Sequence, residues 1–231
     1  MDKAEFDKFA EEYAQMHKRS IQASGEGPEF FAEYKIKDIA VECEHISSND
    51  TIRILDFGAG IGGSIPYVKK YFSNVNLTCL DVSQRSLEIA KERYPDSAKF
   101  VHFDGQNIPL PTGYFDTVYA MCVFHHIDHG EHISLLKELY RVLRTGGSLF
   151  VFEHNPYNPL TVRVVNSCEF DENARLISGV KMKKCFAKAG FIQPTVKYRV
   201  FFPHSLKTLR PFEKFLTWVP FGGQYFVKGK K

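Results

Sequence analysis

The sequence predicts an α/β protein built on a doubly wound, mostly parallel seven-stranded sheet with an antiparallel last strand. Three observations lead to this prediction. From Thr51 onward, short apolar runs alternate with amphipathic stretches, and such alternation is typical of βαβ units on a parallel sheet. A glycine-rich loop follows the first apolar run. The chain ends in two apolar runs separated by an insertion, which indicates an antiparallel pair at a sheet edge.

Helices are expected ahead of the sheet, in residues 1–48. Apolar residues recur at helical spacing in the first 20 residues. Gly25 and Gly27 then break the pattern, and a second helix is expected from about Pro28 to Glu44. We expect residues 1–48 to form a helical lid over a core that comprises residues 49–231.

Seven apolar segments are expected to form the strands of the sheet. They cover residues 51–57, 75–81, 98–104, 115–124, 147–153, 191–201 and 224–230. Amphipathic segments between the first five strands carry helical spacing, in residues 64–72, 84–94 and 131–144. Ser83 stands where the N-cap of the second of these helices belongs.

The alternation changes after Glu153. A loop rich in Pro and Asn follows, and residues 160–170 carry no clear pattern. A helix is expected from about Asn173 to Ala189, because Gly190 is a typical C-cap signal.

An insertion precedes the last strand. Residues 203–220 are expected to contain a short helix with apolar residues on one side, Leu206, Leu209, Phe212 and Phe215. Core packing is the first interpretation of these residues and of the aromatic and basic residues around them. A ligand pocket, a dimer contact and a peripheral membrane contact stay open. We expect specificity to come from loops near 155–172 and 199–223.

Composition is that of an ordinary globular protein. The chain has 231 residues, of which 44% are hydrophobic and 25% are charged. No apolar run approaches the ~18 residues of a membrane span, and the charged start of the chain is unlike a signal peptide. Five scattered cysteines without a CxxC pattern indicate reduced thiols. We therefore expect a cytoplasmic protein that is not integral to the membrane.

Charge is distributed unevenly along the chain. The net charge is +3, yet residues 173–231 hold 13 Lys and Arg against one acid, Glu213. This asymmetry favours either an anionic partner for the C-terminal part or a solvated basic surface that balances an acidic N-terminal part.

The most distinctive motif is the loop Leu55–Gly63. Glycine suits a tight turn where a ligand approaches the backbone closely. Gly58, Gly60 and Gly63 fit the pattern G-x-G-x-x-G, whereas Gly58, Gly60 and Gly62 fit G-x-G-x-G equally well. The loop alone is weak evidence for one ligand.

Three carboxylates narrow the choice of ligand. Asp81 ends the second strand, where an acid can accept both hydroxyls of a ribose. Asp104 ends the third strand, where it suits the amino group of an adenine. Asp56 precedes the glycine loop, where a carboxylate would suit a ligand ammonium and repel a pyrophosphate. The set disfavours a nicotinamide dinucleotide.

Four ordered motifs resemble those of the class I, seven-strand S-adenosylmethionine-dependent methyltransferases. They are ILDFGAGIGG, LDVSQRSLEIAKERY, FDGQNIPLPTGYFDTVYAMCVFHHI and ELYRVLRTGGSLFVFE, and the resemblance covers roughly residues 50–155. The sequence departs from the family at Arg144 and Thr145, where Lys-Pro is commoner. The resemblance implies that residues 49–231 form a Rossmann-like methyltransferase core with S-adenosyl-L-methionine as its cofactor.

The resemblance also implies roles for individual residues. The backbone of Gly58, Ala59 and Gly60 would pass the methionine moiety, near Asp56. The remaining cofactor-binding candidates are Asp81 for the ribose, Val82 against the adenine, Asp104 for the adenine amino group with Gly105 and Gln106 beside it, and Met121 at the end of the fourth strand.

Histidines after the fourth and fifth strands are candidate proton acceptors. A hydroxyl or ammonium acceptor must lose a proton, and histidine suits that task. His125 and His126 follow the fourth strand, and His154 follows the fifth. The resemblance favours His126 as a residue lining the cofactor and acceptor space. It also makes Tyr13 and His17 lid candidates, with packing of an amphipathic helix as the alternative.

The same region is rich in potential metal ligands, namely His125, His126, Asp128, His129, Glu131 and His132. Histidines at helical spacing can share one face of a helix. The stretch, however, spans a strand end and a helix start, and Gly130 interrupts it. We therefore expect no functional metal.

These expectations together predict an enzyme that transfers a methyl group to a small molecule. The acceptor is expected to be an oxygen of an anionic or sugar-like metabolite, attacked in line with the S–CH3 bond. An RNA methyltransferase and a non-catalytic cofactor-binding protein are the alternatives, although no appended RNA-binding module is evident and a nucleic acid partner is not favoured. We expect a monomer or a homodimer.

Overall fold

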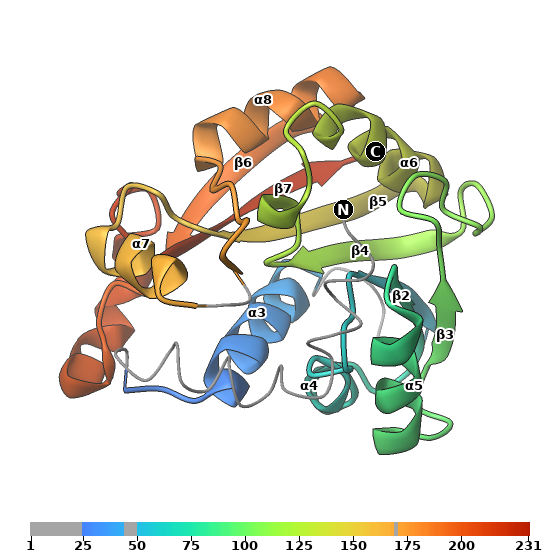
Figure 1. The fold of residues 1–231 in the computed structure, drawn as a ribbon, viewed down its shortest axis with the longest axis horizontal. Helices are drawn as coiled ribbons and strands as arrows, with labels where there is room; N and C mark the ends of the chain where they lie inside the picture. The colour runs from blue at the N-terminus through green and yellow to red at the C-terminus, as the bar shows by residue number, and fades with distance from the viewer. Residues whose placement is uncertain (1–24, 44–49, 169–170) are drawn as a thin grey trace.

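The computed structural model describes residues 25–43, 50–168 and 171–231 of the chain (Figure 1). Among the described residues, no helix has both the length and the apolar character that a membrane-spanning helix requires.

The centre of the fold is a seven-stranded sheet with the strand order β3-β2-β1-β4-β5-β7-β6. Neighbours among β1 to β5 pair in parallel, whereas β7 pairs antiparallel with both β5 and β6. This confirms the predicted sheet with its antiparallel last strand. The strands are β1 Ile52–Phe57, β2 Val75–Asp81, β3 Lys99–His102, β4 Phe115–Met121, β5 Leu143–His154, β6 Ile192–Arg199 and β7 Gln224–Lys230.

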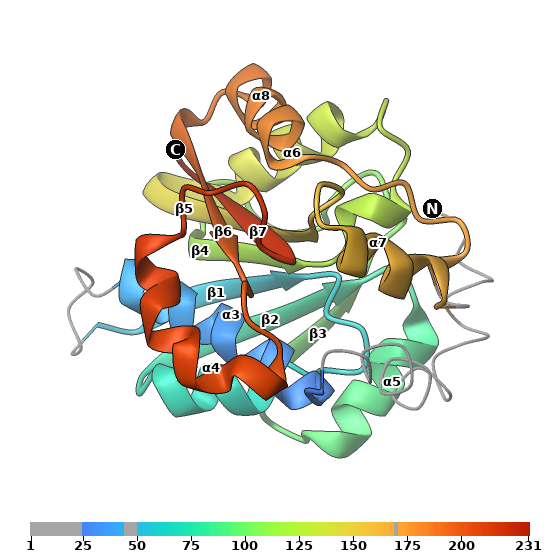
Figure 2. The same ribbon diagram turned by 90° about the vertical axis from the view of Figure 1, so that its left-hand side faces the viewer.

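Helices cover both faces of the sheet (Figure 2). On one face, α3 (Pro28–Glu42), α4 (Ile65–Tyr71) and α5 (Gln84–Arg93) pack into a buried cluster with β1, β2, β4, β5 and β7. On the other face, α6 (His132–Val142) and α8 (Gly179–Ala189) pack into a second cluster. Strands that are apolar on both sides fit this three-layer arrangement.

The strand order reverses between β1 and β4, since β2 and β3 lie on one side of β1 and the later strands on the other. Ligands of open α/β sheets bind outside the carboxyl ends of the strands at such a point. A ligand site is therefore expected in the segments that follow β1, β2, β4 and β5.

Two local predictions differ from the structure in the C-terminal half. The helix expected from Asn173 begins only at Gly179, because the Ser178 side chain caps it by accepting from the Lys181 amide at 3.4 Å. The preceding segment is held in a loop, where the Arg175 amide donates to the His125 carbonyl at 2.7 Å. For residues 160–170 the sequence predicts no secondary structure. The structure has the helix α7 (Pro159–Asn166) over most of this stretch, and Asn158 caps it.

The insertion before β7 forms the 3-10 segment η4 (His204–Phe215), which is kinked at Leu206. Its apolar residues Leu206, Leu209, Phe212 and Phe215 are exposed. The core-packing interpretation is therefore wrong for this side of the segment. The physical reason is that the segment turns Glu213 inward, where its Oε1 accepts from the amides of Phe201 and Phe202 at 3.0 Å.

The described part of the predicted lid is α3, which packs against the sheet through Ile36 and Ile39. The predicted lid residues Tyr13 and His17 lie outside the described residues. The division into a lid of 1–48 and a core of 49–231 stays a prediction.

Candidate active site

The glycine loop connects β1 to α4 and has one packed side and one open side. The amides of Gly58 and Ala59 donate to the Leu80 carbonyl at 2.8 and 3.1 Å, which holds the loop against β2. Gly58 has a φ of +76°, and a Cβ there would stand 2.4 Å from a methyl carbon of Val123. Gly60 has a φ of +51°, yet a Cβ there would meet no atom of the described residues within 4 Å. Among these residues, the backbone at Gly60 is therefore not covered by a side chain.

Asp81 lies at the end of β2 and contacts this loop. Its Oδ2 accepts from the Gly60 amide at 2.7 Å, and its Oδ1 accepts from the Ser83 amide at 2.9 Å. Asp81 thus holds the backbone of the glycine loop and of Ser83, which caps α5. The ribose contact of Asp81 stays a prediction.

Asp104 lies in the loop after β3 and caps its own turn. Its Oδ1 accepts from the amides of Gln106 and Asn107 at 2.8 and 2.7 Å. A Cβ on the neighbouring Gly105 would stand 3.7 Å from Val82. The structure thus brings Val82 and Gly105 together, while Asp104 and Gln106 are exposed on the same loop. Their adenine contacts stay predictions.

Asp56 lies in the interior, where its Oδ2 accepts from the Ser64 hydroxyl at 2.5 Å. Tyr119 in turn donates to the Ser64 oxygen at 3.1 Å. Burial raises the pKa of Asp56 to about 7, although the hydrogen bonds from Ser64 and Tyr119 act in the opposite direction. These contacts join β1 to the start of α4 and do not support the predicted contact between Asp56 and a ligand ammonium.

The end of β4 carries a feature that sequence analysis missed. Met121 is half-buried against the cluster beneath α3, and Cys122 follows with a φ of +57°. Lys35 of α3 donates to the Cys122 sulfur at 3.2 Å. Burial by itself would raise the pKa of Cys122, but the Lys35 ammonium and the His154 ring lower it to about 7.

His125 is buried between two carboxylates. Its Nδ1 lies 2.6 Å from Glu153 Oε2, and its Nε2 lies 3.4 Å from Asp171 Oδ1. Glu153 also accepts from the amides of Val123 and Phe124 at 3.0 and 2.7 Å. Burial would lower the pKa of His125, but Glu153 and Asp171 raise it well above its usual range. His125 is therefore a charged structural group and a poor proton acceptor.

His126 is neutral and weakly basic. Its Nε2 lies 3.4 Å from Asp171 Oδ1. Burial and the neighbouring charge of His125 lower the pKa of His126 to about 3. A general base works best with a pKa near the working pH, so the structure disfavours the prediction that His126 takes a proton.

His154 ends β5 and lies beside Cys122. Its ring forms a hydrogen bond with the Cys122 thiol that lowers the pKa of that thiol. Its Nδ1 lies 3.4 Å from Gln224 Nε2, at the start of β7. Lys35, Cys122, His154 and Gln224 thus meet from α3, β4, β5 and β7. We name these four residues the thiol cluster.

The potential metal ligands of the sequence separate in space. His129 Nε2 lies 3.1 Å from the Arg175 carbonyl, and His132 Nε2 lies 2.9 Å from the Phe124 carbonyl. Within the described ranges, ligand atoms of His125, His154 and Asp171 do lie within 4.8 Å of one another. Because both nitrogens of His125 already face carboxylates, hydrogen bonding and ion pairing account for this trio.

Comparison with known proteins gives the family. Residues 55–151 match the family model described as methyltransferase domain. This segment is a class I S-adenosylmethionine-dependent methyltransferase domain. The predicted family and the predicted cofactor are confirmed, and the match covers the glycine loop, Asp81, Asp104 and the end of β4.

The methyltransferase domain is similar in sequence to several curated proteins. Ubiquinone/menaquinone biosynthesis C-methyltransferase UbiE of Ectopseudomonas mendocina is 30% identical over 128 residues, which cover 51% of this chain and 48% of that protein. Sterol 24-C-methyltransferase ERG6B of Gibberella zeae is 31% identical over 106 residues, 44% of this chain and 27% of that protein. The matched region therefore spans half or less of the length of these relatives.

Solved structures show the same fold. A possible histamine N-methyltransferase of Thermotoga maritima superposes with a TM-score of 0.67 at 20% identity and covers 99% of both chains. A phosphoethanolamine N-methyltransferase of Haemonchus contortus in complex with S-adenosyl-L-methionine superposes with a TM-score of 0.66 at 17% identity, covering 98% of this chain and 60% of that one.

Proposed function

We propose that this chain transfers the methyl group of S-adenosylmethionine to an oxygen of a small anionic or sugar-like acceptor. The observation that carries this proposal is the thiol cluster. It combines the buried ammonium of Lys35 with the thiol of Cys122, whose pKa is about 7. The cluster lies at the carboxyl ends of β4 and β5.

The cofactor supplies an activated methyl group, because its sulfur is a sulfonium. The protein then has to hold the acceptor in line with the S–CH3 bond and exclude water, and such alignment can lower a barrier by several kcal/mol. The glycine loop and Asp81, which accepts from the Gly60 amide at 2.7 Å, are the groups that we expect to hold the cofactor. Met121 is the last residue of β4 and immediately precedes Cys122 of the thiol cluster.

A hydroxyl acceptor must also lose its proton. Of the three predicted histidines, His125 is held between carboxylates and His126 has a pKa of about 3. The pair of Cys122 and His154 has a pKa of about 7 at the thiol. We therefore assign proton acceptance to this pair.

Lys35 supports an anionic acceptor. Only 5% of this residue is exposed, and its ammonium donates to the Cys122 sulfur at 3.2 Å. By contrast, several bases of residues 173–231 are engaged by acids of α3. Arg199 pairs with Asp38 at 2.7 Å, and Lys228 pairs with Glu42 at 2.6 Å. These bases therefore lend little support to the anionic partner that the charge asymmetry suggested.

Carbon methylation is the second candidate. The curated relatives above are named as C-methyltransferases. An activated carbon acceptor such as a phenol ring or an enol also loses a proton, so the same Cys122–His154 pair would suit it.

The proposal is tested by incubating the full chain with methyl-labelled S-adenosylmethionine and fractionated metabolite pools. A labelled product whose methyl carbon shows the NMR shift of a methoxy group supports oxygen transfer, whereas a carbon-bound methyl group supports the second candidate. The matched variants are Asp81→Ala, which should reduce labelling at a cofactor concentration below saturation, and the exposed Glu92→Ala of α5, which should not. Labelled RNA, or cofactor binding without any labelled product, would contradict the proposal.

A further inference from the structure

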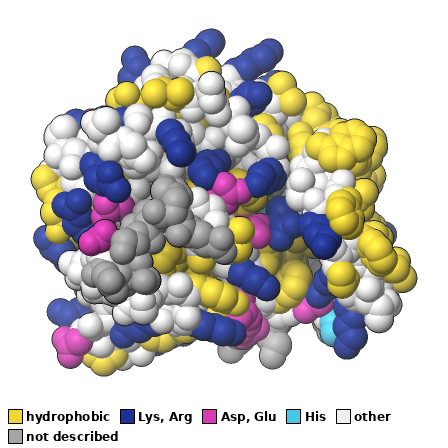
Figure 3. All heavy atoms as spheres, turned by 180° about the vertical axis from the view of Figure 1, so that it is seen from behind, with side chains coloured by type: hydrophobic (Ala, Val, Ile, Leu, Met, Phe, Trp, Pro, Cys, Tyr) yellow, Lys and Arg dark blue, Asp and Glu magenta, His cyan; other side chains and the backbone are white. Residues whose placement is uncertain are grey.

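A continuous apolar face lies along the edge of the molecule that carries η4. Figure 3 shows hydrophobic side chains gathered there with Lys and Arg beside them. The three most exposed large apolar residues there are Trp218 (77%), Phe221 (65%) and Phe215 (64%). We name as the aromatic face the exposed residues Leu206, Leu209, Phe212, Phe215, Trp218 and Phe221.

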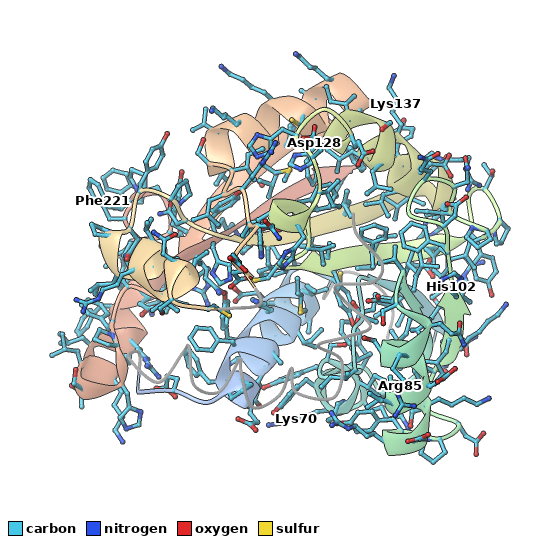
Figure 4. All side chains as sticks on the ribbon, in the orientation of Figure 1. Lys70, Arg85, His102, Asp128, Lys137 and Phe221 are labelled. Atoms are coloured by element: carbon cyan, nitrogen blue, oxygen red, sulfur yellow. The ribbon has the colours of Figure 1, made fainter. Side chains whose placement is uncertain are left out.

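The aromatic face continues onto α7. Asn158 donates through its amide to the Phe221 carbonyl at 2.8 Å, and Figure 4 shows Phe221 beside α7. Exposed Tyr157 and Leu160 flank Asn158 in the chain. Two segments that are 63 residues apart in sequence therefore adjoin, and each carries exposed large apolar side chains.

The charges around this face are positive. Residues 203–221 contain the bases Lys207, Arg210 and Lys214 and a single acid, Glu213. Glu213 is buried and accepts from backbone amides. Arg210 pairs with Glu26 at 2.6 Å. Among the described residues of the insertion, the exposed charges are thus the ammonium groups of Lys207 and Lys214.

We propose that the aromatic face docks onto the surface of an anionic phospholipid bilayer. Interfacial segments combine Trp, Phe and Leu with Lys and Arg, so that the rings enter the headgroup region while the long basic side chains reach anionic lipids. Charge complementarity selects this occupant. A second copy of the chain in a two-fold contact would bring two further lysines and no exposed acid of the insertion into the interface, and an excess of like charge there is unfavourable.

The docking surface adjoins the candidate active site. Asn155 follows β5 directly, and its side chain donates to the carbonyls of Pro220 and Gly222 at 3.0 and 2.7 Å. Gln224, a member of the thiol cluster, lies only three residues after Phe221. Docking would therefore bring this end of the active site close to the lipid headgroups.

The chain offers a direct probe, because Trp218 is its single tryptophan. The test adds vesicles of phosphatidylglycerol and phosphatidylcholine to the full chain at low ionic strength and records tryptophan emission. We expect a blue shift, quenching by brominated lipid acyl chains, and weakening of binding by salt. No acceptor is needed, so failure of docking and failure of the proposed methyl transfer are separate outcomes.

Variants identify the surface responsible. Lys207→Gln and Lys214→Gln should each weaken vesicle binding about fivefold at low salt. The variant with Phe212→Ala, Phe215→Ala and Phe221→Ala retains Trp218 and should lose the blue shift. The matched controls are Val180→Ala of α8 and Ile192→Ala of β6, which are similarly exposed apolar residues outside the aromatic face and should bind as the unsubstituted chain does.

Three results would overturn the proposal. One is an emission spectrum that anionic vesicles leave unchanged. Another is equal binding to vesicles of pure phosphatidylcholine, which would show that the lysines do not select anionic lipid. The third is a blue shift that depends on protein concentration without vesicles and accompanies a dimer in sedimentation velocity, which would assign the face to a second copy of the chain.

Discussion

Asp81 joins two parts of the candidate site through one side chain, because its two oxygens accept from the amides of Gly60 and Ser83. Its position after β2 follows from sequence, since the apolar run ends there. Lys35 and Cys122 are different. They lie 87 residues apart, and neither stands in a pattern that indicates a contact. Only the packing of α3 against the sheet brings the ammonium to the thiol.

The first prediction concerns Asp81→Ala. Loss of hydrogen bonds to a charged group costs about 1–3 kcal/mol, so the variant should bind S-adenosylmethionine roughly 5- to 150-fold more weakly in calorimetry. Glu92→Ala should bind normally, because Glu92 is exposed on α5. Unchanged affinity in the Asp81 variant would exclude its predicted ribose role.

The second prediction concerns Cys122. Its pKa of about 7 lies below the ordinary 9.0, so its thiolate fraction and alkylation rate should rise through pH 7. Burial raises the pKa of Cys43, Cys79 and Cys185, which should react more slowly.

Peptide mass spectrometry after brief alkylation measures each site. Lys35→Met should move the Cys122 midpoint upward, with about tenfold less thiolate at pH 7 for each unit of pKa. The exposed Lys37→Met on the same helix is the control. Identical pH profiles for the two variants would refute the contact.

The third prediction concerns Asp56, whose pKa is raised from 3.8 to about 7. Below pH 4 the carboxyl is protonated in both folded and unfolded chains. Between pH 4 and 7 the unfolded chain ionises first, so stability is lost, by at most about 4 kcal/mol. Asp56→Asn should therefore raise the melting temperature more at pH 8 than at pH 5. An equal change at both values would show that Asp56 does not titrate in this range.

At the level of elements, the segment after β5 shows how one buried side chain positions a long insertion. Asn155 is fully buried, and its amide donates to two carbonyls of the turn before β7. The sequence analysis placed Asn155 in a loop that is expected to confer specificity, and this role of the loop stays a prediction. In the structure the Asn155 side chain fastens the insertion, because its amide group donates to two carbonyls within the protein.

The fourth prediction concerns Asn155→Ala. Loss of the donor to the buried Gly222 carbonyl costs about 1–3 kcal/mol, and loss of the part-buried bond to the Pro220 carbonyl adds to this cost. The free energy of unfolding in urea should fall by about 2–4 kcal/mol. The exposed Asn166→Ala at the end of α7 should change stability by less than about 0.5 kcal/mol. Equal effects of the two variants would refute the fastening role.

At the level of the whole molecule, the candidate site joins elements from three distant parts of the chain. The glycine loop and Asp81 come from β1 and β2, Cys122 from the end of β4, and Lys35 from α3. Sheet topology brings the strand ends to one edge, which is why ordered motifs could predict this half of the site. The other half of the site includes Lys35 of α3 and Gln224 of β7. No sequence motif marks these two residues, so sequence analysis could not predict them.

Sequence alone determined the strands, the glycine loop, the second-strand acid and the methyltransferase family, because periodicity and close backbone turns are local and leave a pattern in the chain. The tertiary structure decided the protonation of His125 and His126, the thiol cluster and the exposure of the aromatic face. These properties depend on burial and on charges from distant elements, and a side chain acquires both only when the layers pack together.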